Sequence, residues 1–130
     1  MKMLLGYDGS NAAMDALKLA VLHARAFNAE INVVRSLAGG HEENEAKIKT
    51  ANDQLEFVED YIKKEGLPCE THLLIRGLTA GEDMVRFAKE NSIDTIFIGV
   101  KRRSSVGKLL FGSNARYIIL NAPCPVVSIR

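Results

Sequence analysis

The chain has 130 residues, a length typical of one domain, and 47% of them are hydrophobic, which is enough for a buried core without disulfide support. Charged residues make up 25%, and 17 basic against 16 acidic side chains leave a formal net charge of +1. This balance argues against a whole-surface nucleic-acid binder, which would be clearly basic, and against an acidic, disordered chain.

Cys69 and Cys124 are too few and too isolated for a disulfide framework, and they indicate two reduced, buried residues in a cytosolic protein. No apolar run approaches the roughly 20 residues that a membrane helix needs. The opening MKMLLGYDGS has only four apolar residues before a turn signal, too short for a signal-peptide core. We therefore expect a cytoplasmic protein with neither a membrane nor a nucleic-acid partner.

The first third of the chain predicts a strand, a helix and a strand. An apolar run at 2–7 ends in the turn cluster DGS, and a helix over 11–29 follows, with Ser10 or Asn11 as its cap. A second strand covers 30–37. The apolar residues at helical spacing are Ala13, Leu17, Ala20, Val21, Ala24 and Phe27. This order is a βαβ unit, whose strands should be parallel and whose crossover should be right-handed.

The segment 38–66 predicts a second helix, which stops at Gly66 and Pro68. Its apolar positions are Ile48, Ala51, Leu55, Val58 and Ile62. Positions 42–65 also hold eight acids and four lysines, which is typical of a solvated outer face.

The rest of the chain predicts strands at 69–77, 93–100 and 125–130, and helices at 79–92 and 113–123. Thr79 with Glu82 three residues later forms a capping-box pattern at the start of the third helix. The whole chain, 1–130, therefore predicts a single α/β domain with an open five-stranded parallel sheet and helices on both faces. Ligands of such folds bind beyond the carboxyl ends of the strands, which selects the loops after Tyr7, Val34, Ile75 and Ile98.

The last of these loops, GVKRRSSVGKLLFGS at 99–113, looks suited to a phosphate. It is not a Walker A loop, because Lys108 is followed by Leu109 and Arg102 stands at the earlier glycine position. The first strand is not followed by a dinucleotide fingerprint either, since the glycines of GYDGSN have the wrong spacing.

What remains of the loop still favours an anion. Gly99 ends a strand, where the lack of a side chain lets a ligand approach the backbone. Gly112, Ser113 and Asn114 open a helix whose free N–H groups and dipole attract negative charge. Nearby charge comes from Lys101, Arg102, Arg103 and Lys108. A plain strand-to-helix connection with charges facing water is an equally good interpretation of this pattern.

The chain resembles the universal stress protein family, of the small single-domain type, over essentially its full length. The family motif is Gly, two residues, Gly, nine residues, Gly, then Ser or Thr; Gly99, Gly112 and Ser113 match it, and Arg102 replaces its second glycine. The blocks LLGYDGSNAAMDAL, GLTAGEDMVRFAKENSIDTIFIG and APCPVVSIR are also similar to family blocks in the right order.

The resemblance implies a Rossmann-like or flavodoxin-like sheet in the order 3-2-1-4-5 and a homodimer formed through the last strand. It also implies a bound adenine nucleotide (ATP, with or without Mg²⁺) in a regulatory protein of the stress response. Asp8 would contact ribose or phosphates, and Ser36 would line the adenine pocket by its backbone. The implied binding residues are Tyr7, Asp8, Ser36, Gly99, Lys101, Arg102, Gly112, Ser113 and Asn114.

Two alternatives stay open. Arg102 in place of a glycine could block the pocket, turn outward or clamp a phosphate; a blocked pocket would make the chain a nucleotide-free protein-interaction module. A very slow ATP hydrolase would need Asp8 to hold a metal ion beside a triphosphate. We expect no enzyme, because no histidine, nucleophile or carboxylate pair forms a catalytic arrangement.

Single residues carry alternatives too. Asp8 could simply bond its turn or cap the first helix. Arg35 and Arg76 end the second and third strands and could be phosphate partners or surface charges. Ser104 and Ser105 could contact phosphate, be phosphorylated, or face water. The three histidines, His23, His41 and His72, share no metal-ligand spacing with the cysteines, so no metal site is expected.

Overall fold

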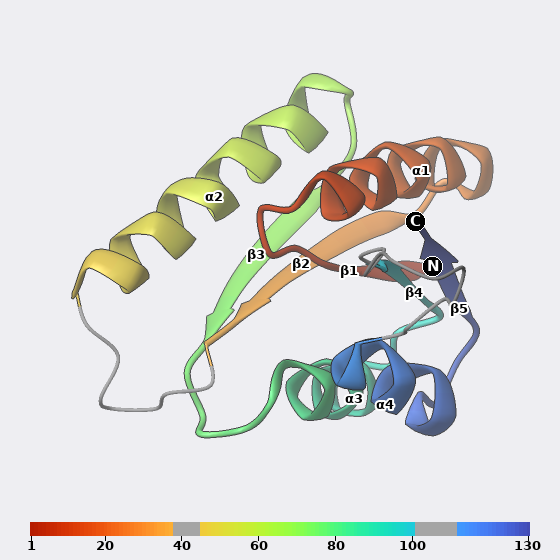
Figure 1. Ribbon diagram of the computed structural model, residues 1–130. Helices are drawn as coiled ribbons and strands as arrows, with labels where there is room; N and C mark the ends of the chain where they lie inside the picture. The colour runs from red at the N-terminus through yellow and green to blue at the C-terminus, as the bar shows by residue number, and fades with distance from the viewer. Residues whose placement is uncertain (38–44, 101–111) are drawn as a thin grey trace.

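The computed structural model describes residues 1–37, 45–100 and 112–130 and contains alternating strands and helices (Figure 1). In chain order they are β1 (Lys2–Gly6), α1 (Asn11–Phe27), β2 (Glu30–Ser36), α2 (Glu45–Lys64), β3 (Cys69–Leu74), α3 (Ala80–Glu90), β4 (Thr95–Gly99), α4 (Ser113–Asn121) and β5 (Val126–Ile129). Each element was predicted, and the strands and helices are shorter than predicted by a few residues at their ends.

The five strands form one parallel sheet in the order β3-β2-β1-β4-β5, which confirms the predicted fold class and strand order. Strand β1 lies at the centre, with Gly6 paired to Val34 of β2 and Leu5 paired to Phe97 of β4. The chain thus moves from β1 outward to β3 and then crosses to the other side of β1. This crossing is the switch point at which open parallel sheets bind ligands.

Helices α1 and α2 cover one face of the sheet, and α3 and α4 cover the other (Figure 1). Alternate residues of β1 explain the two layers, because successive strand side chains point to opposite faces. Met3 and Leu5 belong to the core under α1 and α2, whereas Leu4 belongs to the core under α3 and α4. All three are at most 1% exposed, so the central strand is buried on both sides, as its unbroken apolar sequence predicts.

The helix boundaries follow from local chemistry. Ser10 is the N-cap of α1 and accepts a hydrogen bond from the N–H of Ala13 at 3.1 Å. The capping box of α3 is confirmed, with Thr79 and Glu82 bonded to each other's backbone. Phe27, the last of the apolar residues at helical spacing in α1, is 59% exposed, and its ring lies beside that of His23.

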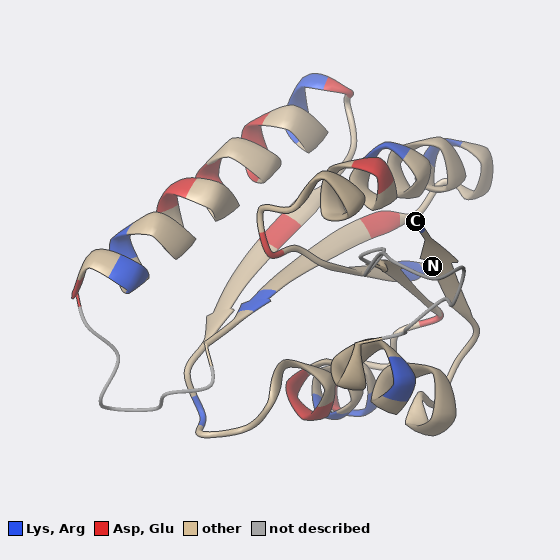
Figure 2. Cartoon of the chain, viewed as in Figure 1, with Lys and Arg blue, Asp and Glu red and all other residues tan. Residues whose placement is uncertain are grey.

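Helix α2 carries its charges along its outer surface (Figure 2). Its buried residues are Ala51, Leu55, Val58 and Ile62, four of the five apolar positions predicted. Ion pairs one turn apart, Lys49–Asp53 at 3.0 Å and Glu59–Lys63 at 2.9 Å, lie on its exposed side. No helix in the described parts of the chain has the length and apolar character needed to span a bilayer.

Candidate functional site

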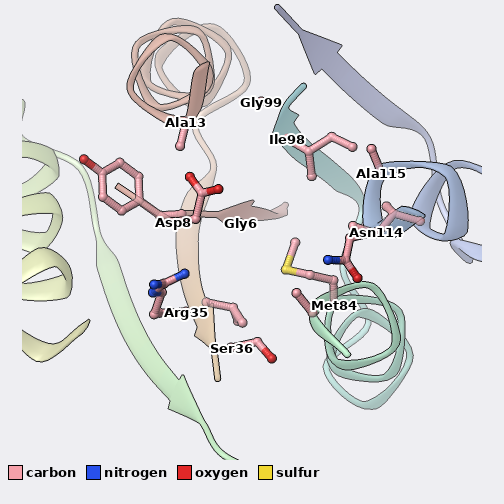
Figure 3. Close-up of a pocket in the computed structure, with 14 residues that line it drawn as sticks. Gly6, Asp8, Ala13, Arg35, Ser36, Met84, Ile98, Gly99, Asn114 and Ala115 are labelled. Atoms are coloured by element: carbon pink, nitrogen blue, oxygen red, sulfur yellow. The ribbon is translucent and has the colours of Figure 1, made fainter. Parts of the chain in front are cut away.

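Two adjoining cavities, of about 130 and 180 Å³, lie at the carboxyl ends of β1, β2 and β4. Asp8, Gly99, Asn114 and Ala115 border both, so the two cavities adjoin and are treated as one crevice. Figure 3 shows the first of them. The crevice lies at the switch point of the strand order. This is the location predicted for a ligand from the topology of the fold.

The first cavity, here called the apolar cavity, has mostly hydrophobic walls from β2, β4, α1, α3 and α4. These walls are formed by Ala13, Val34, Ala80, Met84, Ile98, Ala115 and Ile118. Its polar lining is limited to the ends of β1 and β2 and to Asn114. The second, here called the polar cavity, is lined by Asp8, Gly99, Val100, Gly112, Ser113, Asn114 and Ala115. An apolar slot that opens onto a polar recess suits a ligand with a flat apolar part and a polar tail.

Tyr7 and Asp8 follow β1 directly and line the apolar cavity. Tyr7 is 8% exposed, and its burial, with the neighbouring Asp8 carboxylate, raises the pKa of its phenol. One carboxylate oxygen of Asp8 accepts a hydrogen bond from the N–H of Ser10 at 3.0 Å. Asp8 therefore bonds its own turn, which is the structural interpretation given above. Its side chain also borders both cavities, as the ligand-binding interpretation requires.

Ser36 faces the crevice with its backbone. The carbonyl of Val34 accepts from Tyr7 N–H on the β1 side, and Leu37 N–H donates to Leu74 on the β3 side. Because successive peptide groups of a parallel strand alternate sides, those of Ser36 point toward β1. There they lie beyond Gly6–Val34, the last pair in the β1–β2 ladder. Ser36 thus offers one donor and one acceptor to the crevice.

The side chain of Ser36 is held elsewhere, since its hydroxyl donates to Asp83 Oδ2 of α3. Asp83 is fully buried and also accepts from Arg76 Nε at 2.8 Å. Burial opposes the charge of Arg76, but hydrogen bonds to Asp83 and to Glu90 outweigh it and raise the pKa of the guanidinium. Of the two arginines at strand ends, Arg76 is thus occupied by carboxylates, whereas Arg35 lines the apolar cavity.

Gly99 is a glycine for a steric reason that the sequence did not predict. A Cβ at this position would lie 2.3 Å from the carbonyl carbon of Ala12 and 2.6 Å from the nitrogen of Ala13. The end of β4 therefore packs directly on the backbone of the first turn of α1. Gly99 also borders both cavities, so a ligand approaching its backbone is compatible with this packing.

The N-terminus of α4 faces the polar cavity. Gly112 is its N-cap and has no side chain, so in the described residues no N-cap side chain satisfies the first N–H groups of the helix. Asn114 Oδ1 accepts from Gly81 N–H of α3 at 2.9 Å. With its oxygen fixed in this way, the amide nitrogen of Asn114 points into the apolar cavity (Figure 3). The polar cavity is lined by the peptide groups and the Ser113 hydroxyl at the start of α4, and Asn114 borders both cavities.

The structure brings together most of the predicted binding residues. Those lining one cavity or both are Tyr7, Asp8, Ser36, Gly99, Gly112, Ser113 and Asn114. Lys101 and Arg102 lie outside the described residues, as do Arg103, Ser104, Ser105, Lys108 and His41. In the described ranges no group of three His, Cys, Asp or Glu side chains could hold a metal ion.

Sequence reasoning missed the apolar wall that α3 contributes, above all Met84 and Ala80. Their periodicity marks them as core residues of an amphipathic helix, and nothing in the sequence distinguishes a core position from a cavity wall. Gly6 also lines this cavity, and a Cβ there would lie 3.0 Å from the end of the Met84 side chain.

Comparison with known proteins identifies the family to which the chain belongs. The model of the universal stress protein family matches residues 1–130. The universal stress protein in the QAH/OAS sulfhydrylase 3′ region of Thermus aquaticus is 31% identical, over 98% of this chain and 97% of the relative. The chain belongs to the universal stress protein family.

Solved structures agree. A universal stress protein from Archaeoglobus fulgidus is 39% identical with a TM-score of 0.91, covering 100% of this chain and 98% of that one. A universal stress protein structure from the same organism, solved in complex with dAMP, is 35% identical with a TM-score of 0.86 and the same coverage. The similarity extends over all of the elements that form the crevice.

Proposed function

We propose that this protein binds an adenine nucleotide in the crevice and acts as a regulatory protein. The observation that carries the proposal is the junction of the apolar cavity, which suits a base, with the donor-rich N-terminus of α4, which suits phosphates. The dAMP complex of the 35% identical relative supports the choice of ligand class. ATP is the nucleotide that we test first.

The phosphates belong in the polar cavity. Peptide N–H groups at a helix N-terminus and the positive end of the helix dipole stabilise anions. Ser113, whose hydroxyl is a further donor, and Asn114 line the same cavity. Asp8 is the acidic group at this place, and it fits either a ribose hydroxyl or a Mg²⁺ ion carried by the phosphates.

The base belongs in the apolar cavity, between Val34 and Met84. Adenine presents an acceptor ring nitrogen beside its amino donor. The N–H and carbonyl of Ser36 form the complementary pair, so the backbone can recognise adenine without any particular side chain. The hydrogen bond from the Ser36 hydroxyl to Asp83 helps to hold this backbone in place.

We propose a regulatory rather than a catalytic role. The described part of the crevice offers no histidine, no nucleophile with a base, and no second carboxylate beside Asp8. Signalling would instead pass through a homodimer formed by β5, whose outer edge is unpaired in the described structure. A cytoplasmic location fits the two free thiols, Cys69 and Cys124.

Titration calorimetry and thermal unfolding with ATP, ADP, AMP and dAMP, with and without Mg²⁺, test the proposal. A ligand that binds only the folded state stabilises it by about 2.7 kcal/mol at one hundred times its Kd, which raises Tm by several degrees. If millimolar ATP produces neither heat nor a Tm shift, nucleotide binding is wrong and a nucleotide-free interaction module is favoured. Release of phosphate above background, lost in Asp8→Ala, would contradict the non-catalytic role.

The variant Ser113→Asp locates the phosphates. A carboxylate in the first turn of α4 interacts favourably with the positive end of the helix dipole, so the variant should be at least as stable as the wild type. The same charge repels a phosphate from the helix N-terminus, so ATP affinity should fall at least tenfold. Ser113→Ala, which removes one donor only, should lose much less. Equal affinities in all three proteins would place the nucleotide elsewhere.

A further inference from the structure

Arg35 lines the apolar cavity with a donor, its Nε, that no side chain or backbone group of the described residues satisfies. Its Nε is buried and has no hydrogen-bond partner, and in the described ranges Arg35 forms no ion pair. Arg76 occupies the equivalent place after β3 but is bonded to Asp83 and Glu90. A buried donor without a partner is unfavourable, which makes Arg35 a group that a ligand would complete.

The position of Arg35 follows from the alternation of β2. Ile31 and Val33 lie in the core beneath α1 and α2, so Arg35, two residues further on, lies on the same face at the end of the strand. Ser36 points its side chain to the opposite face, toward Asp83 of α3. Arg35 therefore reaches the apolar cavity from the α1 and α2 side, on the same side of the view as Asp8 (Figure 3).

We infer that Arg35 reads the base of the bound nucleotide, donating a hydrogen bond to a purine ring nitrogen that Ser36 leaves free. This inference rests on the proposed nucleotide binding. A guanidinium can only donate hydrogen bonds, so its partner must be an acceptor. The phosphates have donors at the N-terminus of α4, in the polar cavity. Arg35 lines the apolar cavity and does not line the polar cavity. The acceptor within its reach is therefore on the base.

The consequence is a preference for purines. Adenine has ring nitrogens on both of its edges, and the Ser36 backbone pairs with only one of them and the amino group. A pyrimidine ring is smaller and leaves Arg35 without an acceptor at the same depth. Arg35 therefore determines specificity between base classes, whereas the phosphate-binding helix end holds any nucleotide.

Binding of ATP and its 1-deaza, 3-deaza and 7-deaza analogues, with CTP, to wild type and to Arg35→Leu tests the inference by calorimetry. Each analogue replaces one ring nitrogen by C–H. Wild type should bind CTP at least about tenfold more weakly than ATP. It should bind one deaza analogue equally weakly, the one that lacks the ring nitrogen bonded to Arg35, because hydrogen bonds to charged groups are strong. In Arg35→Leu that analogue should bind as well as ATP does. Leucine keeps the apolar stem, so the fold should survive.

Arg86→Gln is the matched control. It removes an arginine that is 60% exposed on α3 and pairs with Glu90, away from both cavities. It should leave the order of affinities unchanged. If Arg35→Leu weakens ATP, CTP and all analogues by one common factor, Arg35 contacts the phosphates or ribose and the inference is wrong. Equal affinities in wild type and Arg35→Leu also overturn it, whereas absence of ATP binding to wild type refutes the proposed function itself.

Discussion

His72 shows how a single half-buried ring makes the stability of this protein depend on pH. Its Nε2 donates to the Oδ1 of Asn32, which is 8% exposed, and its ring lies 4.7 Å from that of Phe87. Burial lowers the pKa of His72 from its ordinary 6.5, and Glu70 at 3.8 Å opposes this shift only weakly. The folded protein thus favours the neutral imidazole.

The sign of the pH effect follows from this shift. The unfolded chain takes up a proton at His72 near pH 6.5 and the folded chain does so only at lower pH, so the free energy of unfolding falls as pH drops from 6.5 to the folded pKa. His72→Gln retains a donor for Asn32 and does not titrate. In urea unfolding at pH 7.5 and 5.5, wild type should lose more stability than His72→Gln. Equal losses would show that His72 titrates alike in both states.

The two arginines at the ends of β2 and β3 show a limit of prediction from the sequence. Arg35 and Arg76 are both arginines at the ends of neighbouring strands, and the sequence leaves the same two interpretations for each. Only the packing of α3 on the sheet brings Asp83 to Arg76, whereas the Nε of Arg35 has no hydrogen-bond partner among the described residues. Arg76 and Asp83 are only seven residues apart, but the spacing alone does not say that α3 folds back onto the end of β3.

At the scale of elements, Gly99 and Gly112 are two glycines of one motif with different physical roles. A side chain at Gly99 would collide with the backbone of α1, as close as 2.3 Å, and backbone does not move aside cheaply. Gly112 has a φ of −58°, which any residue adopts, and a Cβ there would meet no described atom within 4 Å. The motif therefore fixes helix–strand packing at one end and the opening of a helix at the other.

Alanine at each glycine should separate these roles. Gly99→Ala should lower the free energy of unfolding by about 3 kcal/mol, because overpacking against backbone forces α1 away from β4. Gly112→Ala should cost less than about 1 kcal/mol, the usual effect of a weaker N-cap. Denaturant unfolding of both variants measures the difference. Comparable losses would mean that α1 shifts easily and that the close approach is not a constraint.

The elements themselves were largely predictable, and the reasons are local. Helical spacing in α1 and α2, the Thr79 capping box and short apolar runs ended by turn residues defined all nine elements. Their order in the sheet came from the family resemblance, since periodicity does not say which strands pair. The cavity walls, such as Met84, required the three-dimensional arrangement.

At the scale of the whole molecule, β5 connects the crevice to the edge of the sheet. Val100, which lines the polar cavity, donates its N–H to the carbonyl of Ile129 at 2.7 Å. A ligand that fixes Val100 therefore also fixes the end of β5. This contact provides a direct route by which a bound nucleotide could alter the proposed dimer interface.

The outer edge of β5 has a defined set of free backbone groups. Pro125 and Ile129 point their carbonyls toward β4, where Ile96 and Val100 donate to them. Because peptide groups alternate, those of Val126 and Ser128 point outward, where no described strand pairs with them. Elsewhere on the surface, Ile119 and Leu120 of α4 are 45% and 70% exposed, an apolar surface that association could cover.

Ser128→Pro should therefore dissociate the proposed dimer without disturbing the monomer. Proline removes the outward N–H of Ser128 and is tolerated on an edge strand, while the bonds between β4 and β5 use other residues. Sedimentation equilibrium should show the dimer dissociation constant raised at least tenfold in Ser128→Pro and unchanged in Ser128→Ala, with similar Tm for the folded monomers. A wild type that is monomeric at all concentrations, or a proline variant that still dimerises as tightly, would mean that β5 is not the interface. If nucleotide acts through Val100 and Ile129, ATP should change the wild-type dissociation constant and leave that of Ser128→Pro unaffected.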